Sequence, residues 1–340
     1  MRSRFLVVVF SVFYLLHMES VAQETILECT DSTFCIPSVA WMPRTKGIEI
    51  NRETVYNDKI TSTGRNGYPL NGNGEISSNS RWEFKLRAPI MLKPHLKIAL
   101  GLRYFQEDFE FKNVEESNYP FYESLNDKNL KSLGATLYVI RPFLGNKFFL
   151  LRARGSLNGD YTKDDQFSAG DFFRVSVAPM IGWKKDPYTS FAVGAAFGVD
   201  FGRYTVYPVF SYNQSFNQKW GIESLLPVKV KLRYTPDPKN LFYLKTEFKG
   251  ANYRISLNDP NLEMDRLYNL QKLEVRYLLT YEREIHDWLW VGLESGLRSN
   301  VRFNLDESDF GRDTVIESNF GTAFMLKFSL FVVPPRKLLE

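Results

Sequence analysis

The chain has 340 residues, of which 44% are hydrophobic, 15% aromatic and 24% charged, so its composition excludes an intrinsically disordered protein. Its formal net charge of +4 is small and dispersed, without a compact Lys/Arg cluster, which argues against a nucleic-acid-binding protein. The length fits one large domain or two ordinary ones.

The first 22 residues have the parts of a secretory signal peptide. Arg2 and Arg4 form a basic start, residues 5–16 are apolar but short for a membrane-spanning helix, and "SVA" at 20–22 offers a cleavage site. We expect residues 1–22 to be removed on export, with an uncleaved anchor as the alternative. No later stretch reaches the roughly 18 apolar residues of a spanning helix, so a membrane-embedded mature chain must cross with strands.

The segment 23–45 precedes the strands, and we interpret it as an N-terminal periplasmic segment or plug. It contains both cysteines of the chain, Cys29 and Cys35. In an oxidising compartment this even pair is a candidate disulfide, and two free thiols are the alternative.

Apolar and polar residues alternate with period two over most of residues 46–332. In "KWGIESLLPVKVKLRY" (219–234), Trp220, Leu226 and Leu232 share one parity, whereas Glu223 and Lys231 share the other. The same pattern recurs in 81–90, 96–104, 148–157, 172–183, 272–282, 289–299 and 318–333. We interpret "KWGIESLLPVKVKLRY" as one long strand.

These alternating segments favour a membrane barrel over a soluble sheet. Several of them are much longer than the usual 5–6 residues of soluble strands and match the 9–11 that a tilted spanning strand needs. In hydrocarbon, strands satisfy their backbone hydrogen bonds only by closing into a barrel. We therefore predict an all-β, transmembrane, antiparallel up-and-down barrel over residues 46–332, followed by a tail at 333–340. A secreted β-sandwich or solenoid is the alternative.

The strand number has a parity problem. We count up to thirteen candidate strands, but single-chain bacterial barrels have an even number. The turns at 217–219 and 236–239 flank what we interpret as one strand, so they cannot both lie at the same end. We predict about twelve strands, with ten to fourteen possible, and place the error in 189–240.

Aromatic residues near the segment ends are typical of the interfacial girdles of such barrels. The candidate girdle residues are Trp82, Tyr104, Trp183, Trp220, Tyr234, Tyr281, Trp288 and Trp290.

The opposite faces carry charges that we expect to point into the lumen, where they either line a water-filled pore or pair across a plugged interior. The predicted lumen-facing residues are Arg152, Arg154, Glu223, Lys229, Lys231, Arg233, Lys245, Glu247, Glu274, Arg276, Glu282, Glu294 and Arg298. Small residues between Ala192 and Gly202 share one face, which suggests that segment 24–45 or a loop packs there.

The stretch 207–255 resembles the signature region of a Bacteroidota-type outer-membrane β-barrel family, classed as a domain of unknown function. The likeness is carried by the tight turn before Lys219-Trp220, by "LLP" at 225–227 and by the closing "YRI" at 253–255. It implies a barrel in the outer membrane of a Gram-negative cell and supplies no activity.

No motif points to an enzyme, a cofactor or a metal site. His95 and His286 are the histidines that remain after signal cleavage, and both fall in predicted turns. The favoured function is a porin-like small-solute channel or a plugged pore with a charged lumen. The alternatives are a structural or adhesive barrel with partner-binding loops and, least favoured, a lipid-modifying enzyme. Expected partners are outer-membrane lipid, lipopolysaccharide, the barrel assembly machinery and a small solute.

Overall fold

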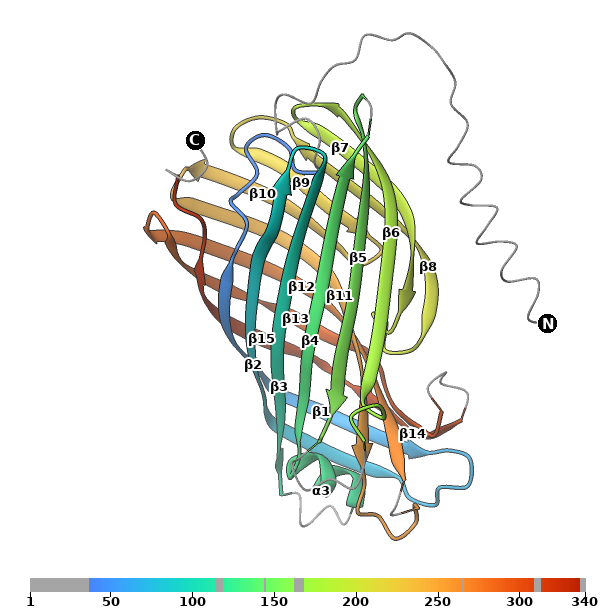
Figure 1. Cartoon of the computed structure of the whole chain (residues 1–340). Helices are drawn as coiled ribbons and strands as arrows, with labels where there is room; N and C mark the ends of the chain where they lie inside the picture. Colours follow the sequence, from blue (N-terminus) through green and yellow to red (C-terminus); the bar gives the residue numbers. More distant parts are fainter. Residues whose placement is uncertain are drawn as a thin grey trace, which may run out of the picture.

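The computed structural model describes residues 37–113, 119–143, 145–161, 168–263, 266–308 and 313–336 (Figure 1). The predicted signal peptide and both cysteines lie outside these ranges. Within them, no helix has the length and apolar character required to cross a membrane.

The strands are β1 (Ile48–Gly64), β2 (Gly72–Lys93), β3 (Leu96–Lys112), β4 (Asn129–Pro142), β5 (Lys147–Gly159), β6 (Phe173–Asp186), β7 (Thr189–Gly198), β8 (Thr205–Ser215), β9 (Trp220–Leu226), β10 (Lys229–Asp237), β11 (Asn240–Ser256), β12 (Leu267–His286), β13 (Leu289–Asp306), β14 (Thr314–Phe320) and β15 (Thr322–Val332), with one helix, α3 (Pro120–Asn126).

These strands form one closed sheet in which each strand pairs antiparallel with its chain neighbour. The segments β14 and β15 are separated only by Gly321, and both lie between β13 and β1. They are two parts of a single barrel strand, which pairs with β1 and closes the ring. The described residues therefore form a barrel of 14 strands, and the prediction of about twelve is wrong.

The missed strand lies inside "KWGIESLLPVKVKLRY". The structure breaks this stretch at Pro227 and Val228 and folds it into the hairpin β9–β10. Lys231 faces Glu223, and Leu232 faces Ile222, so paired residues have the same parity across the turn. A two-residue turn keeps the alternation in phase, which is why the hairpin reads as one strand. The error falls within 189–240, where we placed it.

The hairpin also removes the conflict between the turns. With two strands between them, the turns at 216–219 and 238–239 lie at the same end of the barrel. The other turns of this short-turn end are 94–95, 143–146, 187–188 and 287–288. Longer connections at 65–71, 113–128, 160–172, 257–266 and 307–313 lie at the opposite end. Short turns are periplasmic and long loops extracellular in outer-membrane barrels.

The outer surface is apolar. Leu92, Val206 and Leu244 are 69%, 75% and 63% exposed, and each lies on the side of its strand that faces away from the lumen. Large apolar residues on the other strands continue this surface, far beyond the patch that a soluble monomer tolerates. The chain is a transmembrane β-barrel, and single-chain barrels of this kind lie in the outer membrane of Gram-negative bacteria.

The barrel is not uniform along its length. Strands β7 to β10 are short, and the connection 199–204 between β7 and β8 turns into the barrel, where a Cβ on Gly250 would meet the backbone of Asp200 and Gly202. Toward the extracellular end β5 reaches β11 directly, with Gly159 paired to Arg254 (Figure 1). The extracellular part is consequently narrower than the periplasmic part, because fewer strands surround it.

Sequence alternation also left α3 unpredicted. Its residues belong to an acidic stretch of the sequence, and the helix has only seven residues. In the structure Phe121 and Tyr122 of α3 are fully buried in the extracellular mouth (Figure 1). Residues 267–273, in the stretch of the sequence with the most helix-like spacing, form the start of β12.

Candidate functional site

The N-terminal segment lies across part of the periplasmic mouth. The hydroxyl of Ser190 donates to the carbonyl of Pro37 at 2.6 Å, and the Lys184 ammonium donates to the carbonyl of Ser38 at 2.8 Å. The Arg233 guanidinium donates to the carbonyl of Trp41. These contacts hold residues 37–41 against β6, β7 and β10. On the small face between Ala192 and Gly202, where we expected segment 24–45 or a loop, Phe148 of β5 and Met180 of β6 pack against Ala192 and Ala196. Residues 24–36 of that segment lie outside the described ranges.

The segments directly before β1 and directly after β15 meet at the turn after β12. Arg44, which precedes β1, and Arg336, which follows β15, both bond the carboxylates of Glu284 and Asp287. The backbone N–H of Arg336, together with the positive charge of Arg44, lowers the pKa of Asp287. Lys46 bonds Glu282 at 2.6 Å, although burial lowers the pKa of its ammonium. The described part of the C-terminal tail is thus fixed beside the vestibule.

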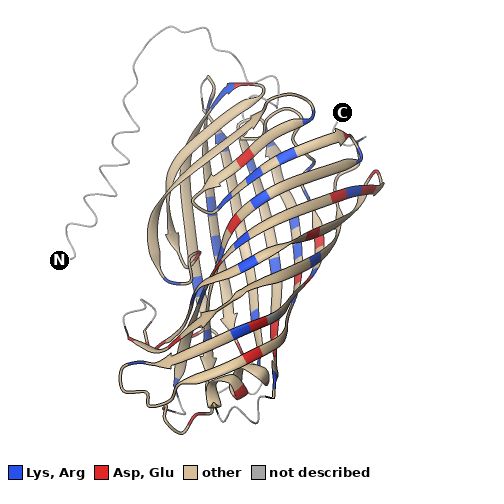
Figure 2. Cartoon of the chain, turned by 180° about the vertical axis from the view of Figure 1, so that it is seen from behind, with Lys and Arg blue, Asp and Glu red and all other residues tan. Residues whose placement is uncertain are grey.

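A cavity of about 870 Å³ occupies the periplasmic half of the lumen. We call it the vestibule. It reaches the short-turn end at Gln218 and Pro238, and about half of the residues in its wall are charged. Charged residues lie along many strands of the barrel (Figure 2). Typical wall pairs are Lys245 with Glu294 at 2.7 Å and Arg87 with Glu49 at 3.1 Å. A cavity of this size accepts a small organic solute.

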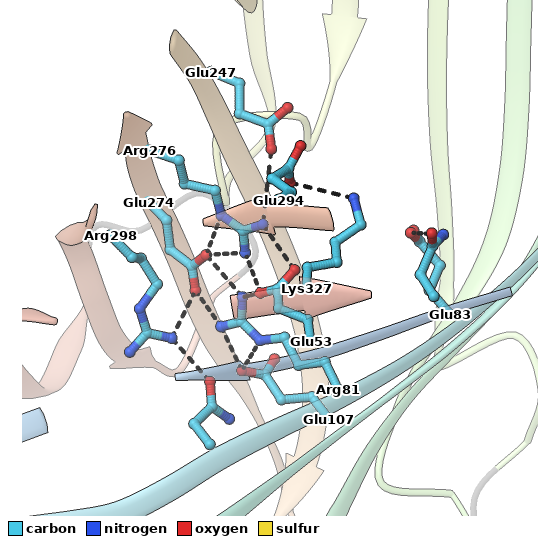
Figure 3. Close-up of polar contacts among 12 residues, drawn as sticks. Glu53, Arg81, Glu83, Glu107, Glu247, Glu274, Arg276, Glu294, Arg298 and Lys327 are labelled. Atoms are coloured by element: carbon cyan, nitrogen blue, oxygen red, sulfur yellow. Dashed lines mark hydrogen bonds and ion pairs between the residues drawn. The ribbon is translucent and has the colours of Figure 1, made fainter. Parts of the chain in front are cut away.

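The vestibule ends at a buried group of charges, which we call the ion-pair cluster (Figure 3). Arg81 bonds Glu53 at 2.7 Å and also contacts Glu107 and Glu274. Arg276 bonds Glu53 and Glu274 as well. The cluster is completed by Arg298 with Asp58 and by Lys272 with Glu107, so that its members are Glu53, Asp58, Arg81, Glu107, Lys272, Glu274, Arg276 and Arg298.

The composition of the cluster explains why it is stable in the barrel. It contains four cations and four carboxylates, all at most 4% exposed, so its formal charge is zero. The side chains come from β1, β2, β3, β12 and β13, which places them on adjoining parts of the wall. Each charge is desolvated, and each has an opposite partner within hydrogen-bonding distance, as buried charges require.

A second polar layer crosses the lumen from the opposite wall. Arg174 on β6 donates to the side-chain oxygens of Asn252 on β11 and Asn269 on β12, at 2.8 and 3.1 Å. Asn158 on β5 donates to the backbone carbonyl of Asn252. Beside this layer, Asp200 of the inward connection accepts from Arg152 and from the hydroxyls of Ser176 and Tyr207. The two walls therefore touch, and the lumen is closed at this level.

The extracellular half is filled by an aromatic core. Tyr119, Phe121 and Tyr122, from α3 and its N-terminal flank, insert among inward residues that include Tyr268 and Phe303. These five side chains are each at most 1% exposed. The hydroxyl of Tyr122 donates to Ser62 at 2.9 Å, and that of Tyr68 donates to Asp259 at 2.5 Å. Burial raises the pKa of Tyr122 to about 12 and also raises that of Tyr68 and Tyr119.

The predicted lumen charges lie on inward-facing positions. Eight of them line the vestibule: Glu223, Lys229, Lys231, Lys245, Glu247, Arg276, Glu282 and Glu294. Glu274 and Arg298 are in the ion-pair cluster, and Arg233 bonds Ser215 beside the N-terminal segment. Arg152 and Arg154 lie deeper, near Asp200.

Sequence reasoning missed five of the eight residues of the ion-pair cluster, namely Glu53, Asp58, Arg81, Glu107 and Lys272. Arg81 and Lys272 were on predicted polar faces but carried no assigned role. Asp58 lies near the point where apolar alternation ends, so the sequence pattern alone does not place it on a strand. The structure continues β1 to Gly64, since backbone pairing in water needs no apolar side chains.

Of the predicted girdle, Trp290 is misplaced. It is only 4% exposed and packs inside the barrel against Phe331, because its parity on β13 is that of Glu294. Trp82, Tyr104, Trp220 and Trp288 are 37–48% exposed. Trp220, Tyr234, Phe242 and Tyr281 follow one another across β9 to β12 with ring centroids 4.5, 6.3 and 4.7 Å apart, and Trp183 stacks on Phe191.

The histidines stand apart from the lumen. His95 lies in the turn between β2 and β3, and His286 ends β12, and both are exposed. Within the described ranges, no group of three or more His, Cys, Asp or Glu side chains is arranged to hold a metal ion.

Comparison with known proteins finds similarity among solved structures alone. No family model and no curated protein matches the chain, so the resemblance of 207–255 to a Bacteroidota-type family stays a prediction. An outer-membrane channel of Pseudomonas putida F1 is 11% identical, with 87% of this chain and 99% of that chain covered and a TM-score of 0.36. A Pseudomonas aeruginosa FadL homologue is 8% identical (85% and 90% covered, TM-score 0.39), and the P. putida toluene transporter TodX is 7% identical (87% and 92% covered, TM-score 0.26). These identities and TM-scores are low, and the strand pairing alone establishes the barrel.

Proposed function

We propose that the protein is an outer-membrane channel for small solutes, in a closed conformation, with a vestibule on the periplasmic side. The observation that carries this proposal is the asymmetry of the lumen. A cavity of about 870 Å³ extends from the periplasmic turns and ends blind at buried polar layers. A purely structural barrel does not need a cavity in its lumen, whereas a channel needs one to hold its solute.

Two barriers separate the vestibule from the exterior. The inner one consists of ion pairs and amide hydrogen bonds, whose groups can exchange protein partners for water when the walls part. The outer one is α3 with its aromatic residues, which belongs to the connection between β3 and β4 and not to the barrel wall. Withdrawal of that connection would remove the outer barrier without breaking any strand pairing.

The test is a conductance measurement in planar lipid bilayers. Residues 119–127, which include α3, are replaced by a Gly/Ser linker of equal length, so that the barrel strands are unchanged. We expect the wild-type protein to be silent. The variant should show discrete conductance steps, because without α3 the polar groups of the inner barrier are open to water from both sides and can exchange protein partners for water. The matched control is Glu123→Gln, which changes an exposed side chain of α3 and should stay silent.

Heat-modifiable migration on a denaturing gel shows whether each variant is a folded barrel. If the linker variant is folded and still silent, the channel proposal is wrong, and the structural or adhesive alternative with partner-binding loops takes its place.

One observation favours a second candidate, a channel for hydrophobic compounds. The extracellular half of the lumen presents aromatic rings rather than charges, and the hydroxyl of Tyr119 is buried there without a hydrogen-bond partner in the described residues. Toluene, the compound for which one of the similar structures is named, is the natural probe. If this candidate is correct, toluene raises the thermal stability of the detergent-solubilised protein, and Phe121→Ala changes that rise. An unchanged melting temperature would exclude it.

A further inference from the structure

The glutamates of the vestibule are all paired with protein cations. Each of the seven glutamates in its wall has a lysine or arginine nitrogen within 4.0 Å. Glu247, for example, lies 3.3 Å from Lys245 and 3.7 Å from Arg276. Asp237, the remaining carboxylate of the wall, accepts hydrogen bonds from Asn240 and from the backbone N–H of Lys239. A positively charged solute would therefore find no free glutamate among the described residues of the vestibule.

Three cations of the lumen wall, in contrast to these glutamates, have no direct ion pair within the described ranges. Lys229, Lys249 and Arg154 have no carboxylate oxygen within 4.0 Å among the described residues. Lys249 instead lies with its ammonium 4.8 Å from the centre of the Phe105 ring. All three side chains are partly buried, whereas Lys219 lies on the exposed turn before β9. Cations that are partly removed from water and lack a direct ion pair are costly to keep, unless a ligand supplies the charge.

Strand register places two of these cations side by side. Lys229 on β10 is the direct partner of Glu247 on β11, and Lys249 is the next inward residue on β11. Diagonal neighbours of this kind are about 7–8 Å apart across a sheet, so two flexible ammonium groups can close on one anion. Lys231, two residues along β10, adds to the positive potential at this point, although it is paired with Glu223 at 3.6 Å.

The third cation continues the line deeper into the barrel. Lys249 lines both the vestibule and a second, much smaller cavity of about 40 Å³. Arg154 lines that second cavity, and the acidic group there, Asp200, is occupied by Arg152 at 3.1 Å. Lys229, Lys249 and Arg154, which have no direct ion pair in the described part of the chain, therefore lie one after another from the vestibule toward the closed layer. The second cavity is large enough only for water, so a solute stops at Lys249 in this conformation.

We propose that Lys229 and Lys249 form a binding site for a small anionic solute that carries a carboxylate or phosphate group, with Arg154 as the next cation along the path. The inference rests on the proposed function, because it names the class of solute that the vestibule takes. A site of paired lysines binds such groups as point charges and does not require one fixed geometry. The vestibule volume leaves room for the rest of the solute.

The test is isothermal titration of the full mature chain in neutral detergent at low ionic strength, with sodium phosphate in one arm and sodium succinate in the other. We expect saturable binding in at least one arm, which identifies the favoured group. The double variant Lys229→Gln/Lys249→Gln should lose affinity by roughly thirtyfold or more, the usual effect of removing charges from a desolvated pair. The control Lys59→Gln, on an exposed lysine of β1, should bind like the wild type.

Two outcomes would overturn the site. One is the absence of saturable binding in both arms, and the other is equal affinity in the double variant, whose fold is verified by heat-modifiable migration. The channel proposal fails separately. If the wild type binds the anion but the linker variant of 119–127 stays silent in bilayers, the vestibule is a binding site in a barrel that does not conduct. If the linker variant conducts and no anion binds, only the present inference is wrong.

Discussion

The two halves of the lumen are built from inward residues of the same strands, yet they have opposite character. In the periplasmic half these residues are lysines and glutamates around a cavity, whereas in the extracellular half they are aromatic and aliphatic and fill the space completely. The barrel wall alone therefore does not decide whether a lumen is open. The difference comes from what enters from the ends: a helix with several buried rings at one end, and a short extended segment at the other.

The ion-pair cluster separates the two halves, and removing a central member should have the largest effect. Arg81→Ala leaves Glu53, Glu107 and Glu274 without their shared partner in a site from which water is excluded. Breaking a buried pair in this way costs about 3–5 kcal/mol. We therefore expect Arg81→Ala to lower the urea midpoint of unfolding in detergent, measured by heat-modifiable migration.

The matched control uses a pair of the same chemistry at the surface. Arg65 and Glu317 are 2.9 Å apart with side chains 55% and 40% exposed. Arg65→Ala should cost less than about 1 kcal/mol, because solvent already screens the pair. If both variants unfold at the same urea concentration, the cluster does not hold the two halves together.

The filled and hollow halves should also differ in their response to truncation. Phe121→Ala removes a fully buried ring from the aromatic core, and such a change typically costs about 3–5 kcal/mol, because the cavity cannot collapse completely. Lys231→Ala shortens a side chain that already borders a cavity and is 27% exposed, so we expect a loss of about 1 kcal/mol or less. Equal shifts of the urea midpoint would mean that the extracellular half is not packed as a core.

The sequence predicts which side of each strand faces the lumen, but it does not predict which inward charges pair with one another. Period-two alternation predicts the barrel, its outer face and the inward position of residues such as Arg276 and Glu294, because each follows from local parity. Which inward charges meet is a different matter. Glu53 and Arg276 are 223 positions apart in the sequence, and only closure of the ring brings them together.

The remaining errors have local causes. The β9–β10 hairpin is hidden because its two-residue turn preserves parity, and Pro227 was the signal that could have revealed it. Trp290 was assigned from its residue type, although its neighbours Leu289 and Val291 already fix it on the inner face. The buried role of α3 could not be read from its sequence, since a short helix gains its stability from the core that receives it and not from its own propensities.

The aromatic half should respond to alkaline pH through its tyrosines. Burial raises the pKa of Tyr122 to about 12, above the value of about 10 that a tyrosine has in an unfolded chain. Between these values the folded protein retains a proton that the unfolded chain releases, so stability is fully present below about pH 10 and falls as the pH rises toward 12. The pKa values of Tyr68 and Tyr119 are raised in the same direction, which steepens the fall.

Tyr122→Phe separates this contribution from general alkaline denaturation. The variant loses the hydrogen bond to Ser62 and is therefore somewhat less stable at neutral pH, by about 1 kcal/mol. Because it has no phenol at this position, its urea midpoint should decline less than that of the wild type between about pH 10 and 12. Parallel declines in the two proteins would show that Tyr122 gains no protection from ionisation in the core, and that this half of the lumen is wetter than the contacts of α3 indicate.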